Sequence, residues 1–432
     1  MLSHLRTAVS TSEDCDCDNG IRVPCILSNA ISCGGVSRGQ YQFAQANTMQ
    51  DDSNKIDSTR SRLRAAMPVT NKWAYFDHAA VAPLCQPAAD ALNAWLTDAV
   101  MEGDTSWLEW ARGVAATRAA AAKLLGAQLE EVALVPNTTV GINLVAEGFP
   151  WMPGDNVVTL DDEFPSNLFP WMHLAGKGVE TRRLSTDLGR VDLDRLADQC
   201  DARTRVVSVS WVDYANGCRR DLAAIGEIAH RHGALLFVDA IQGLGVFPID
   251  VNSANIDCLA ADGHKWMLGP EGAGIAYISE SCLDRLHPTG VGWNSVAHAG
   301  DFSRIELDLK QSAGRYEGGS LNMAGFLALG ASLELLQSLG VENIAATILA
   351  YTDDVCQRLV EVGAMIRSPR SERESSGIVS LEFSDRDPSA IRRHCLDQSV
   401  AINCRAGRLR ISAHAYNNAE DLARLLDAIQ GC

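Results

Sequence analysis

The sequence has too few basic residues, and no apolar run long enough, for several classes of protein. Its 37 Lys and Arg residues are outnumbered by 54 Asp and Glu residues, which gives a formal net charge of −17. Nucleic acids and anionic membranes bind basic surfaces, so neither is expected as a main partner. No stretch reaches the roughly 18 to 20 uninterrupted apolar residues of a membrane-spanning helix. These absences favour a soluble protein with no nucleic-acid or membrane partner.

The 13 cysteines do not have the spacing of a metal centre. Cys15, Cys17, Cys25 and Cys33 lie near the N-terminus but form none of the usual CxxC pairs, so no metal site is predicted. Most cysteines beyond residue 80 occur singly in apolar or helical patterns, which is typical of reduced thiols in a cytoplasmic protein. The basic and apolar segments of a secretory signal are also missing, so a cytoplasmic location is expected.

Residues 1–66 have no sustained hydrophobic periodicity and are rich in Ser, Asn, Asp, Gln and Gly. Such a composition predicts a disordered extension or a start codon assigned too early. The fold is therefore expected to begin near residue 67.

From Glu131 onward, short apolar runs alternate with helical patterns. This alternation is typical of crossover units and a mostly parallel sheet. With 47% hydrophobic residues, the chain can bury a sizeable core. Strands are predicted at residues 132–135, 156–160, 179–184, 206–212, 235–238, 258–261 and 274–278.

Elsewhere apolar residues recur three and four positions apart, which is the pattern of an amphipathic helix. Such helices are predicted at residues 88–100, 107–125 and 323–339. Beyond them, helical patterns surround two further apolar runs, at residues 378–383 and 409–412. We therefore predict a large domain over residues 67–330 and a smaller α+β domain over residues 331–432.

Two residues that pyridoxal phosphate chemistry requires follow neighbouring predicted strands. Asp239 ends one apolar run, and Lys265 follows the next in Asp262-Gly263-His264-Lys265. A lysine amine can form a Schiff base with the cofactor aldehyde, and a carboxylate can keep the pyridine nitrogen protonated. Partial desolvation would lower the pKa of the lysine and free its amine to attack. Taken alone, each residue has a plain alternative: a solvated lysine, and an aspartate that caps a helix.

A phosphate-binding position is predicted where the first strand gives way to a helix. Asn137, Thr138 and Thr139 stand there, and their amide and hydroxyl groups can converge on an anion at the helix N-terminus. Helix capping alone would also explain the two threonines. His264 and Ser320 are possible further donors.

Four other residues are candidates for contact with cofactor or substrate. Phe164 could lie flat on the cofactor ring or belong to the core. Gln242 could donate to a ring hydroxyl or face solvent. Arg405 and Arg410 could clamp a substrate carboxylate with two parallel hydrogen bonds, or form surface salt bridges.

Taken together, these motifs resemble the class V aminotransferase family of pyridoxal phosphate enzymes, which includes cysteine desulfurases, selenocysteine lyases, kynureninases and isopenicillin N epimerases. The resemblance covers roughly residues 72–430. It implies an α/β fold of type I, with a mainly parallel seven-stranded sheet in the large domain, and a homodimer with active sites at the subunit interface. Its most specific motifs are Val238-Asp239-Ala240-Ile241-Gln242, Asp262-Gly263-His264-Lys265, Arg315-Tyr316-Glu317-Gly318-Gly319-Ser320 and Arg410-Ile411-Ser412-Ala413-His414-Ala415-Tyr416-Asn417.

The resemblance implies a role toward the cofactor ring for four residues. Lys265 would be the Schiff-base lysine, and Asp239 the partner of the pyridine nitrogen. Gln242 would contact the ring oxygen. Phe164 would take the place of the stacking histidine of the desulfurases, as in kynureninase and the epimerase-like branch.

The resemblance also implies how the two anionic groups are held. Thr138, His264 and Ser320 would bind the cofactor phosphate, with Ser320 supplied by the neighbouring subunit. Arg410 would hold the substrate carboxylate.

One departure from the family pattern bears on the reaction. In cysteine desulfurases, a loop cysteine that becomes a persulfide lies between the positions of Arg405 and Arg410. Here that interval is Ala406-Gly407-Arg408-Leu409, without a cysteine, and Cys404 precedes it. The expected function is a pyridoxal phosphate enzyme acting on an α-amino acid, resembling a cysteine desulfurase or selenocysteine lyase. An epimerase or aminotransferase is the alternative, and a catalytically silent dimeric binding protein is a second alternative.

Overall fold

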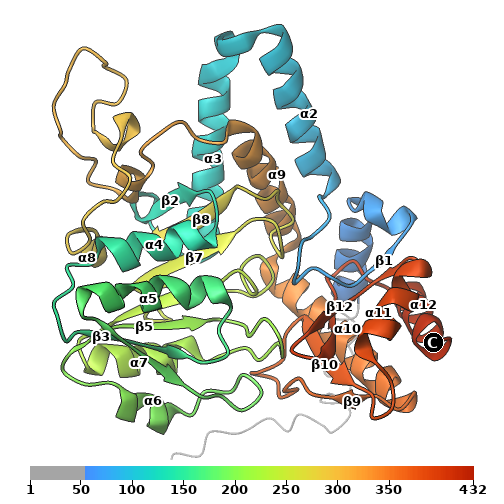
Figure 1. Cartoon of the computed structure of the whole chain (residues 1–432). Helices are drawn as coiled ribbons and strands as arrows, with labels where there is room; N and C mark the ends of the chain where they lie inside the picture. The colour runs from blue at the N-terminus through green and yellow to red at the C-terminus, as the bar shows by residue number, and fades with distance from the viewer. Residues whose placement is uncertain (1–53) are drawn as a thin grey trace, which may run out of the picture. The chain divides into compact units, whose positions relative to one another are not determined.

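A seven-stranded sheet lies at the centre of the computed structural model, which describes residues 54–432 (Figure 1). The strand order is β2-β8-β7-β6-β5-β3-β4, and β8 alone runs in the direction opposite to the other six strands. The predicted α/β fold with a mainly parallel seven-stranded sheet is therefore confirmed. The strands are β2 (Val132–Val135), β3 (Asn156–Leu160), β4 (Glu180–Leu184), β5 (Thr204–Ser210), β6 (Leu235–Asp239), β7 (Cys258–Asp262) and β8 (Gly274–Ile278).

The end of β5 differs from the prediction. The apolar run continues to Val212, but the ladder with β6 ends at Ser210, which pairs with Asp239. Val212 instead forms an isolated antiparallel bridge with Arg219. The chain therefore turns back on itself directly after β5, although its residues remain apolar.

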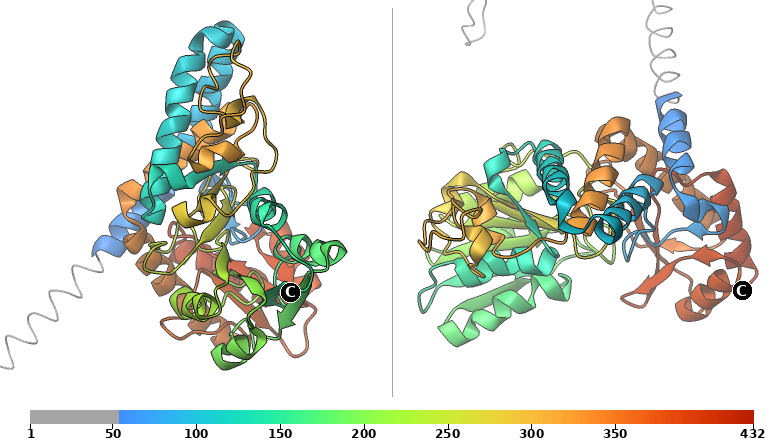
Figure 2. Two further views of the ribbon diagram at one scale, coloured as in Figure 1. Left: turned by 90° about the vertical axis from the view of Figure 1, so that its left-hand side faces the viewer. Right: turned by 90° about the horizontal axis from the view of Figure 1, so that it is seen from above.

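Helices cover both faces of this sheet. Successive strand residues point to opposite faces, so Leu134 and Val135 belong to different hydrophobic clusters. Leu134 packs with residues of α3 (Trp107–Leu125), α6 (Leu193–Gln199), α7 (Leu222–Arg231) and α9 (Met323–Leu339). Val135 packs with residues of α4 (Thr138–Gly148), α5 (Phe169–His173) and α8 (Glu280–Leu283). The predicted helices are found, and α2 (Gln86–Met101) and α3 form a hairpin that projects past the sheet (Figure 2).

A smaller antiparallel sheet lies in the C-terminal part, in the order β12-β13-β10-β9. Two of its strands were predicted, β10 (Ile378–Glu382) and β13 (Arg408–Ser412). The short strands β9 (Met365–Ile366) and β12 (Asn403–Arg405) were not. Its hydrophobic cluster also contains residues of α10 (Val341–Glu361), α11 (Pro388–Asp397) and α12 (Ala419–Gln430).

The chain before the large sheet contributes to this C-terminal part. Strand β1 (Ala74–Tyr75) pairs in parallel with β11 (Val400–Ala401), and Phe76 lies in the same hydrophobic cluster as β10 and β13. The segment from Ala74 to Phe76 therefore packs with residues more than three hundred positions away. The predicted boundary at residue 330 stays a prediction.

The last part of the expected disordered extension, residues 1–66, is ordered in the structure. Residues 54–65 form a helix, and Thr59, Leu63 and Met67 are buried four positions apart. Arg64 of this helix forms an ion pair with Asp421. A single buried stripe gives too weak an apolar pattern to stand out in a polar sequence. Residues 1–53, with the four cysteines weighed as a metal cluster, lie outside the described residues.

Within residues 54–432, no single helix is both long and apolar enough to cross a bilayer. Only α9 and α10 taken together meet the length and composition required, and the chain bends by 78° between them.

Candidate active site

Asp239 and Lys265 come together at the carboxyl edge of the large sheet. Asp239 is the last residue of β6, and Lys265 lies three residues past the end of β7, the parallel neighbour of β6. Both side chains are buried. The Asp239 Oδ1 accepts a hydrogen bond from the Ile241 amide at 3.1 Å, and no helix follows, so the alternative of a helix cap does not apply. Ligands of open α/β sheets bind at this edge.

Burial shifts the pKa values of both groups toward neutrality. Desolvation, reinforced by the charge of Glu163, raises the pKa of Asp239 to about 7. Desolvation lowers the pKa of Lys265 to about 8, although the attraction of Asp239 opposes the shift. A lysine with a lowered pKa supplies the neutral amine that attacks an aldehyde. The alternative of a solvated lysine is therefore wrong.

The ring of Phe164 lies beside Lys265. The Lys265 Nζ is 5.8 Å from the ring centre, and Phe164 is 44% exposed, so it is not a core residue. The ring of Tyr214 meets Phe164 edge-on, with 5.4 Å between centres. An open aromatic face next to a reactive amine can pack against a planar ligand.

The N-terminus of α4 is fixed to the end of β7. Asn137 caps the helix, and the Asp262 amide donates to the Thr138 Oγ1 at 2.9 Å. The Thr139 hydroxyl donates to Ser166 at 2.9 Å. First-turn amides have no partner within their own helix, so this end of α4 can bind an anion.

The two other predicted phosphate donors, His264 and Ser320, lie in different parts of the structure. His264 precedes Lys265, and its Nδ1 is 2.9 Å from the Asp262 carboxylate but is not aligned for a hydrogen bond. Ser320 is exposed and lines a cavity of about 580 Å³ together with Trp107 and Arg118. That cavity includes no other predicted site residue.

Gln242 is held by two hydrogen bonds. Its Oε1 accepts from the Trp266 indole at 2.8 Å, and its Nε2 donates to the Ala79 carbonyl at 3.0 Å. The side chain is buried, so the alternative of a solvent-facing residue is wrong. One amide hydrogen remains for a further contact.

Arg410 is buried, whereas Arg405 is partly exposed. Arg410 donates to the Tyr214 carbonyl at 2.8 Å and to the Asp77 carboxylate at 3.3 Å, and its Nε has no partner among the described residues. Arg405 donates to the Asn403 side chain at 2.9 Å. Asn403 and Arg410 are paired across β12 and β13, so both arginines lie on one face of the small sheet. The alternative of a surface salt bridge is wrong for Arg410.

Sequence reasoning missed Asp77, Tyr214 and Glu163. Asp77 forms an ion pair with Arg410, which lies 333 positions later in the sequence. No local sequence pattern can predict a contact over that separation. Glu163 is buried in an ion pair with Arg220 at 3.0 Å and accepts from the Ser210 amide at 2.7 Å. For Asp77 and Glu163, a charged residue shortly after a strand was the one signal available, and no such signal marked Tyr214.

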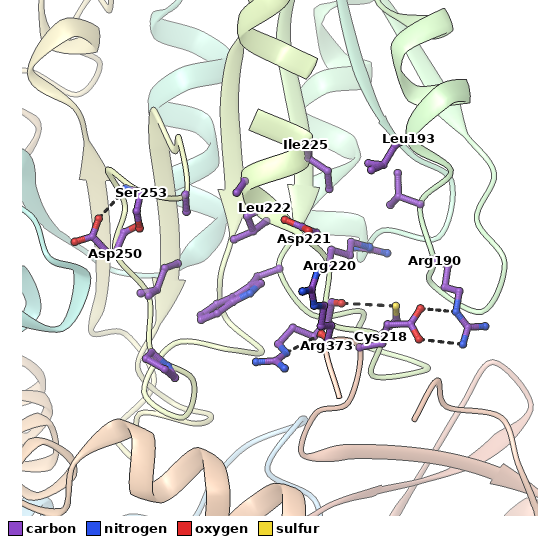
Figure 3. A pocket seen from close by; sticks show the side chains of 18 residues that line it. Arg190, Leu193, Cys218, Arg220, Asp221, Leu222, Ile225, Asp250, Ser253 and Arg373 are labelled. Carbon is purple, nitrogen blue, oxygen red and sulfur yellow. Dashed lines mark hydrogen bonds and ion pairs between the residues drawn. The ribbon is translucent and has the colours of Figure 1, made fainter. Parts of the chain in front are cut away.

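The cavity of about 620 Å³ in Figure 3 is lined in part by Arg220, the ion-pair partner of Glu163. Leu222 and Ile225 of α7 line one side, and Arg373 lies across from them. None of the predicted site residues lines it.

Cys404 does not have the properties of a reactive thiol. Its Sγ donates to the Pro388 carbonyl at 3.3 Å, and burial raises the pKa of the thiol. A nucleophilic cysteine needs a lowered pKa and an accessible sulfur.

The fold and the site together define a pyridoxal phosphate-dependent enzyme of fold type I. The buried amine of Lys265, the carboxylate of Asp239, the open face of Phe164 and the N-terminus of α4 fit the aldehyde, ring nitrogen, ring face and phosphate of this cofactor. The family model for aminotransferase class V matches residues 74–425, and the chain belongs to this family. It is an enzyme that acts on a small amino-acid substrate.

Relatives and solved structures agree with this assignment. A probable cysteine desulfurase of Methanothermobacter thermautotrophicus is 29% identical over 391 residues, covering 85% of this chain and 96% of the relative. A cysteine desulfurase of Escherichia coli is 30% identical over 324 residues, covering 70% and 77%. The apo structure of a cysteine desulfurase from Thermococcus onnurineus superposes with a TM-score of 0.77 at 26% identity, covering 86% and 98%.

Proposed function

We propose that this protein cleaves the carbon–sulfur bond of cysteine or of a closely related amino acid, and that the sulfur does not pass to a cysteine of the enzyme. The observation that carries the amino-acid chemistry is the buried pair of Lys265 and Asp239 at neighbouring strand ends. The cysteine desulfurase relatives support the choice of substrate. The raised pKa of Cys404 and the cysteine-free interval after it support the fate of the sulfur.

When bound, pyridoxal phosphate supplies a protonated ring that stabilises negative charge at the substrate α-carbon. The Lys265 Nζ would hold the cofactor aldehyde and, once displaced by the substrate amine, would take the α-proton. Its pKa of about 8 suits both tasks near neutral pH. Asp239 would hold the proton on the ring nitrogen, and this opposite charge would favour its carboxylate form.

The remaining cofactor contacts follow from positions around Lys265. Phe164 would cover one face of the ring, and Gln242 would use its free amide hydrogen on the ring oxygen. The first turn of α4, with Thr138 and Thr139, would hold the phosphate. His264 would donate to the same phosphate.

Arg410 would bind the substrate carboxylate, with Arg405 beside it. Its Nε is without a partner among the described residues, and the carbonyl of Tyr214 fixes the orientation of the guanidinium. Charge-assisted hydrogen bonds of this kind both bind and orient a carboxylate.

The site is proposed to be completed by a second copy of the chain, in a homodimer. Ser320 is exposed, away from Lys265, so its phosphate contact requires another subunit. Large apolar side chains are also exposed near Ser320 and on the neighbouring loop, and an exposed apolar patch is typical of a subunit interface. They are Trp107, Leu108, Trp293, Phe302, Ile305 and Leu307.

A cytoplasmic location is also proposed. The cysteines among residues 54–432 are free, and most of them are buried, which suits a reducing compartment.

Epimerisation or transamination is the second candidate. It is favoured by Phe164, which by the family resemblance would take the place of the stacking histidine of the desulfurases. Either reaction would use Lys265 and Asp239 in the same way and would leave the carbon–sulfur bond intact.

Product analysis tests the proposal. The purified protein, supplied with pyridoxal phosphate and L-cysteine, is expected to form one of two sets of products. It either releases sulfide together with pyruvate and ammonia, or it transfers the sulfur to an added thiol acceptor, which becomes a persulfide while alanine is left. Lys265→Ala is expected to abolish both the absorption band of the lysine Schiff base and the products. A keto acid or D-isomer without sulfide would establish the second candidate. A lysine Schiff-base absorption band that persists in Lys265→Ala would contradict the assignment of the lysine. A wild-type protein that forms no product from any amino acid would leave the silent binding protein as the explanation.

A further inference from the structure

Four buried rings form a cluster next to Lys265. His78, Trp266, His414 and Tyr416 are almost entirely buried. His78 is 5.2 Å from His414 and from Tyr416, and 6.0 Å from Trp266, between ring centres. The rings come from three segments far apart in the sequence, so the cluster joins the beginning, the middle and the end of the fold.

Hydrogen bonds fix the orientation of these rings. The His78 Nδ1 faces the Ser412 carbonyl at 3.1 Å, and a carbonyl only accepts, so this nitrogen carries the hydrogen. The other nitrogen, Nε2, therefore accepts from the Tyr416 hydroxyl at 2.9 Å. In His414 the roles are reversed: Nδ1 accepts from the Ala415 amide at 2.9 Å, and Nε2 donates to the Trp266 carbonyl at 3.3 Å.

The cluster holds the turn that carries Lys265. Trp266 is the next residue, and both its carbonyl and its indole are engaged, the first by His414 and the second by Gln242. The backbone on the other side is held as well, because the Ala82 amide donates to the His264 carbonyl at 2.7 Å. Lys265 therefore stands between two fixed residues.

The same cluster holds Arg410. His78 binds the backbone of β13 at Ser412, two residues beyond Arg410. Asp77, next to His78, pairs with the Arg410 guanidinium at 3.3 Å. One short segment therefore anchors both the ring cluster and the arginine side chain.

We propose that Tyr416 and His78 are positioning residues that, through His414 and Trp266, fix the Lys265 amine relative to the Arg410 guanidinium. The substrate of the proposed function carries its amine and its carboxylate on one carbon, so these two groups of the enzyme must keep a constant separation. This inference rests on the proposed function for its substrate. Holding reacting groups in a fixed geometry is a large part of enzymatic rate enhancement.

Because the two histidines are buried, their hydrogen-bonding pattern does not change with pH near neutrality. Desolvation lowers the pKa of His414 to about 4 and lowers the pKa of His78 well below its usual value. Both rings therefore stay neutral at physiological pH and keep one donor and one acceptor nitrogen each.

The test compares two tyrosines in the full-length protein. Tyr416→Phe removes only the hydroxyl that binds His78. Tyr351→Phe is the matched control, because Tyr351 is also buried and donates to a backbone carbonyl, that of Asn418, at 3.0 Å, but belongs to α10. The first readout needs no cofactor: competitive acetylation of Lys265, followed by mass spectrometry across pH, gives its apparent pKa. The second readout is KM and kcat with the active amino acid.

Tyr416→Phe is expected to raise the apparent pKa of Lys265 toward that of a solvated lysine and to raise KM roughly fivefold or more. Tyr351→Phe is expected to leave both values unchanged. Wild-type values in Tyr416→Phe, or equal changes in the two variants, would overturn the inference and leave the proposed function standing. A wild-type Lys265 that is acetylated like a solvated lysine would overturn both.

Discussion

The guanidinium of Arg410 and the carboxylate of Asp77 lie 3.3 Å apart in a part of the protein where the arginine side chain is 1% exposed. Desolvation raises the pKa of Asp77, and the nearby Arg410 opposes that shift. Asp77 also accepts from the Asn403 amide at 2.6 Å. The positive charge of the arginine proposed to bind the substrate is therefore already balanced by the carboxylate of Asp77 in the same chain.

Asp77→Asn is expected to lower the free energy of unfolding by about 3 kcal/mol, because it leaves the buried Arg410 charge without a counterion. Urea unfolding measures the change. Asp57→Asn is the control, because its ion pair with Arg60 lies at the surface, where such pairs contribute about 0–1 kcal/mol. Equal small changes in both variants would show that the Asp77 pair contributes no more than a surface pair.

Arg410→Ala is expected to weaken amino-acid binding by about 2 kcal/mol or more, since a charged contact to the carboxylate is lost and Asp77 is left unpaired. Titration of the holoenzyme with substrate measures the effect. Arg408→Ala is the control: Arg408 lies on the same strand and donates to Asn216 at 3.0 Å and Glu382 at 3.2 Å. If both variants bind alike, Arg410 does not contact the substrate.

Cys404→Ala is expected to retain activity within about twofold, because the thiol is partly buried, donates to a carbonyl and has a raised pKa. Sulfide production by the variant and the wild type is compared under the same conditions. Loss of sulfide production, together with a persulfide on Cys404 in the wild-type protein by mass spectrometry, would assign the thiol a direct part in the reaction.

His414→Gln is expected to make stability less sensitive to acid. Desolvation lowers the pKa of His414 to about 4 in the folded protein, whereas the pKa of a histidine in the unfolded chain is about 6.5. The unfolded chain therefore binds more protons between these two pH values, so the free energy of unfolding is highest above about pH 6.5 and falls as the pH drops toward 4. Unfolding free energies measured between roughly pH 4 and 6.5 should therefore fall less steeply in the variant than in the wild type. His173→Gln, at an exposed position, should follow the wild-type slope. Parallel slopes for wild type and His414→Gln would be evidence against a neutral buried ring.

Local sequence patterns predicted most of the central sheet. Buried strands such as Val132–Val135 and Gly274–Ile278 are continuous apolar runs bounded by polar residues, proline or glycine, so their bounds could be located closely. Asp239 and the turn carrying Lys265 could be placed because they follow such runs directly. The helix over residues 54–65 could not, since it buries only one narrow stripe.

Contacts between distant segments could not be predicted in this way. The pairing of Asp77 with Arg410, and the hydrogen bond from Tyr416 to His78, depend on how β1 and β13 are brought together. Strands of two or three residues, such as β9 and β12, are stabilised by their neighbours and have no periodicity of their own. These parts of the site arise from tertiary structure alone.

The pairing of β1 with β11 also sets an order of assembly during translation. Residues 74–75 are made more than three hundred residues before their partner at residues 400–401. At typical synthesis rates the interval lasts roughly tens of seconds. During that time Phe76, Asp77 and His78 have no partner strand, whereas every strand of the large sheet is made before the interval ends. The nascent chain can therefore complete the strands that carry Asp239 and Lys265 well before β13 brings in Arg410. A chain that stops short of β13 would lack the arginine proposed to hold the substrate carboxylate.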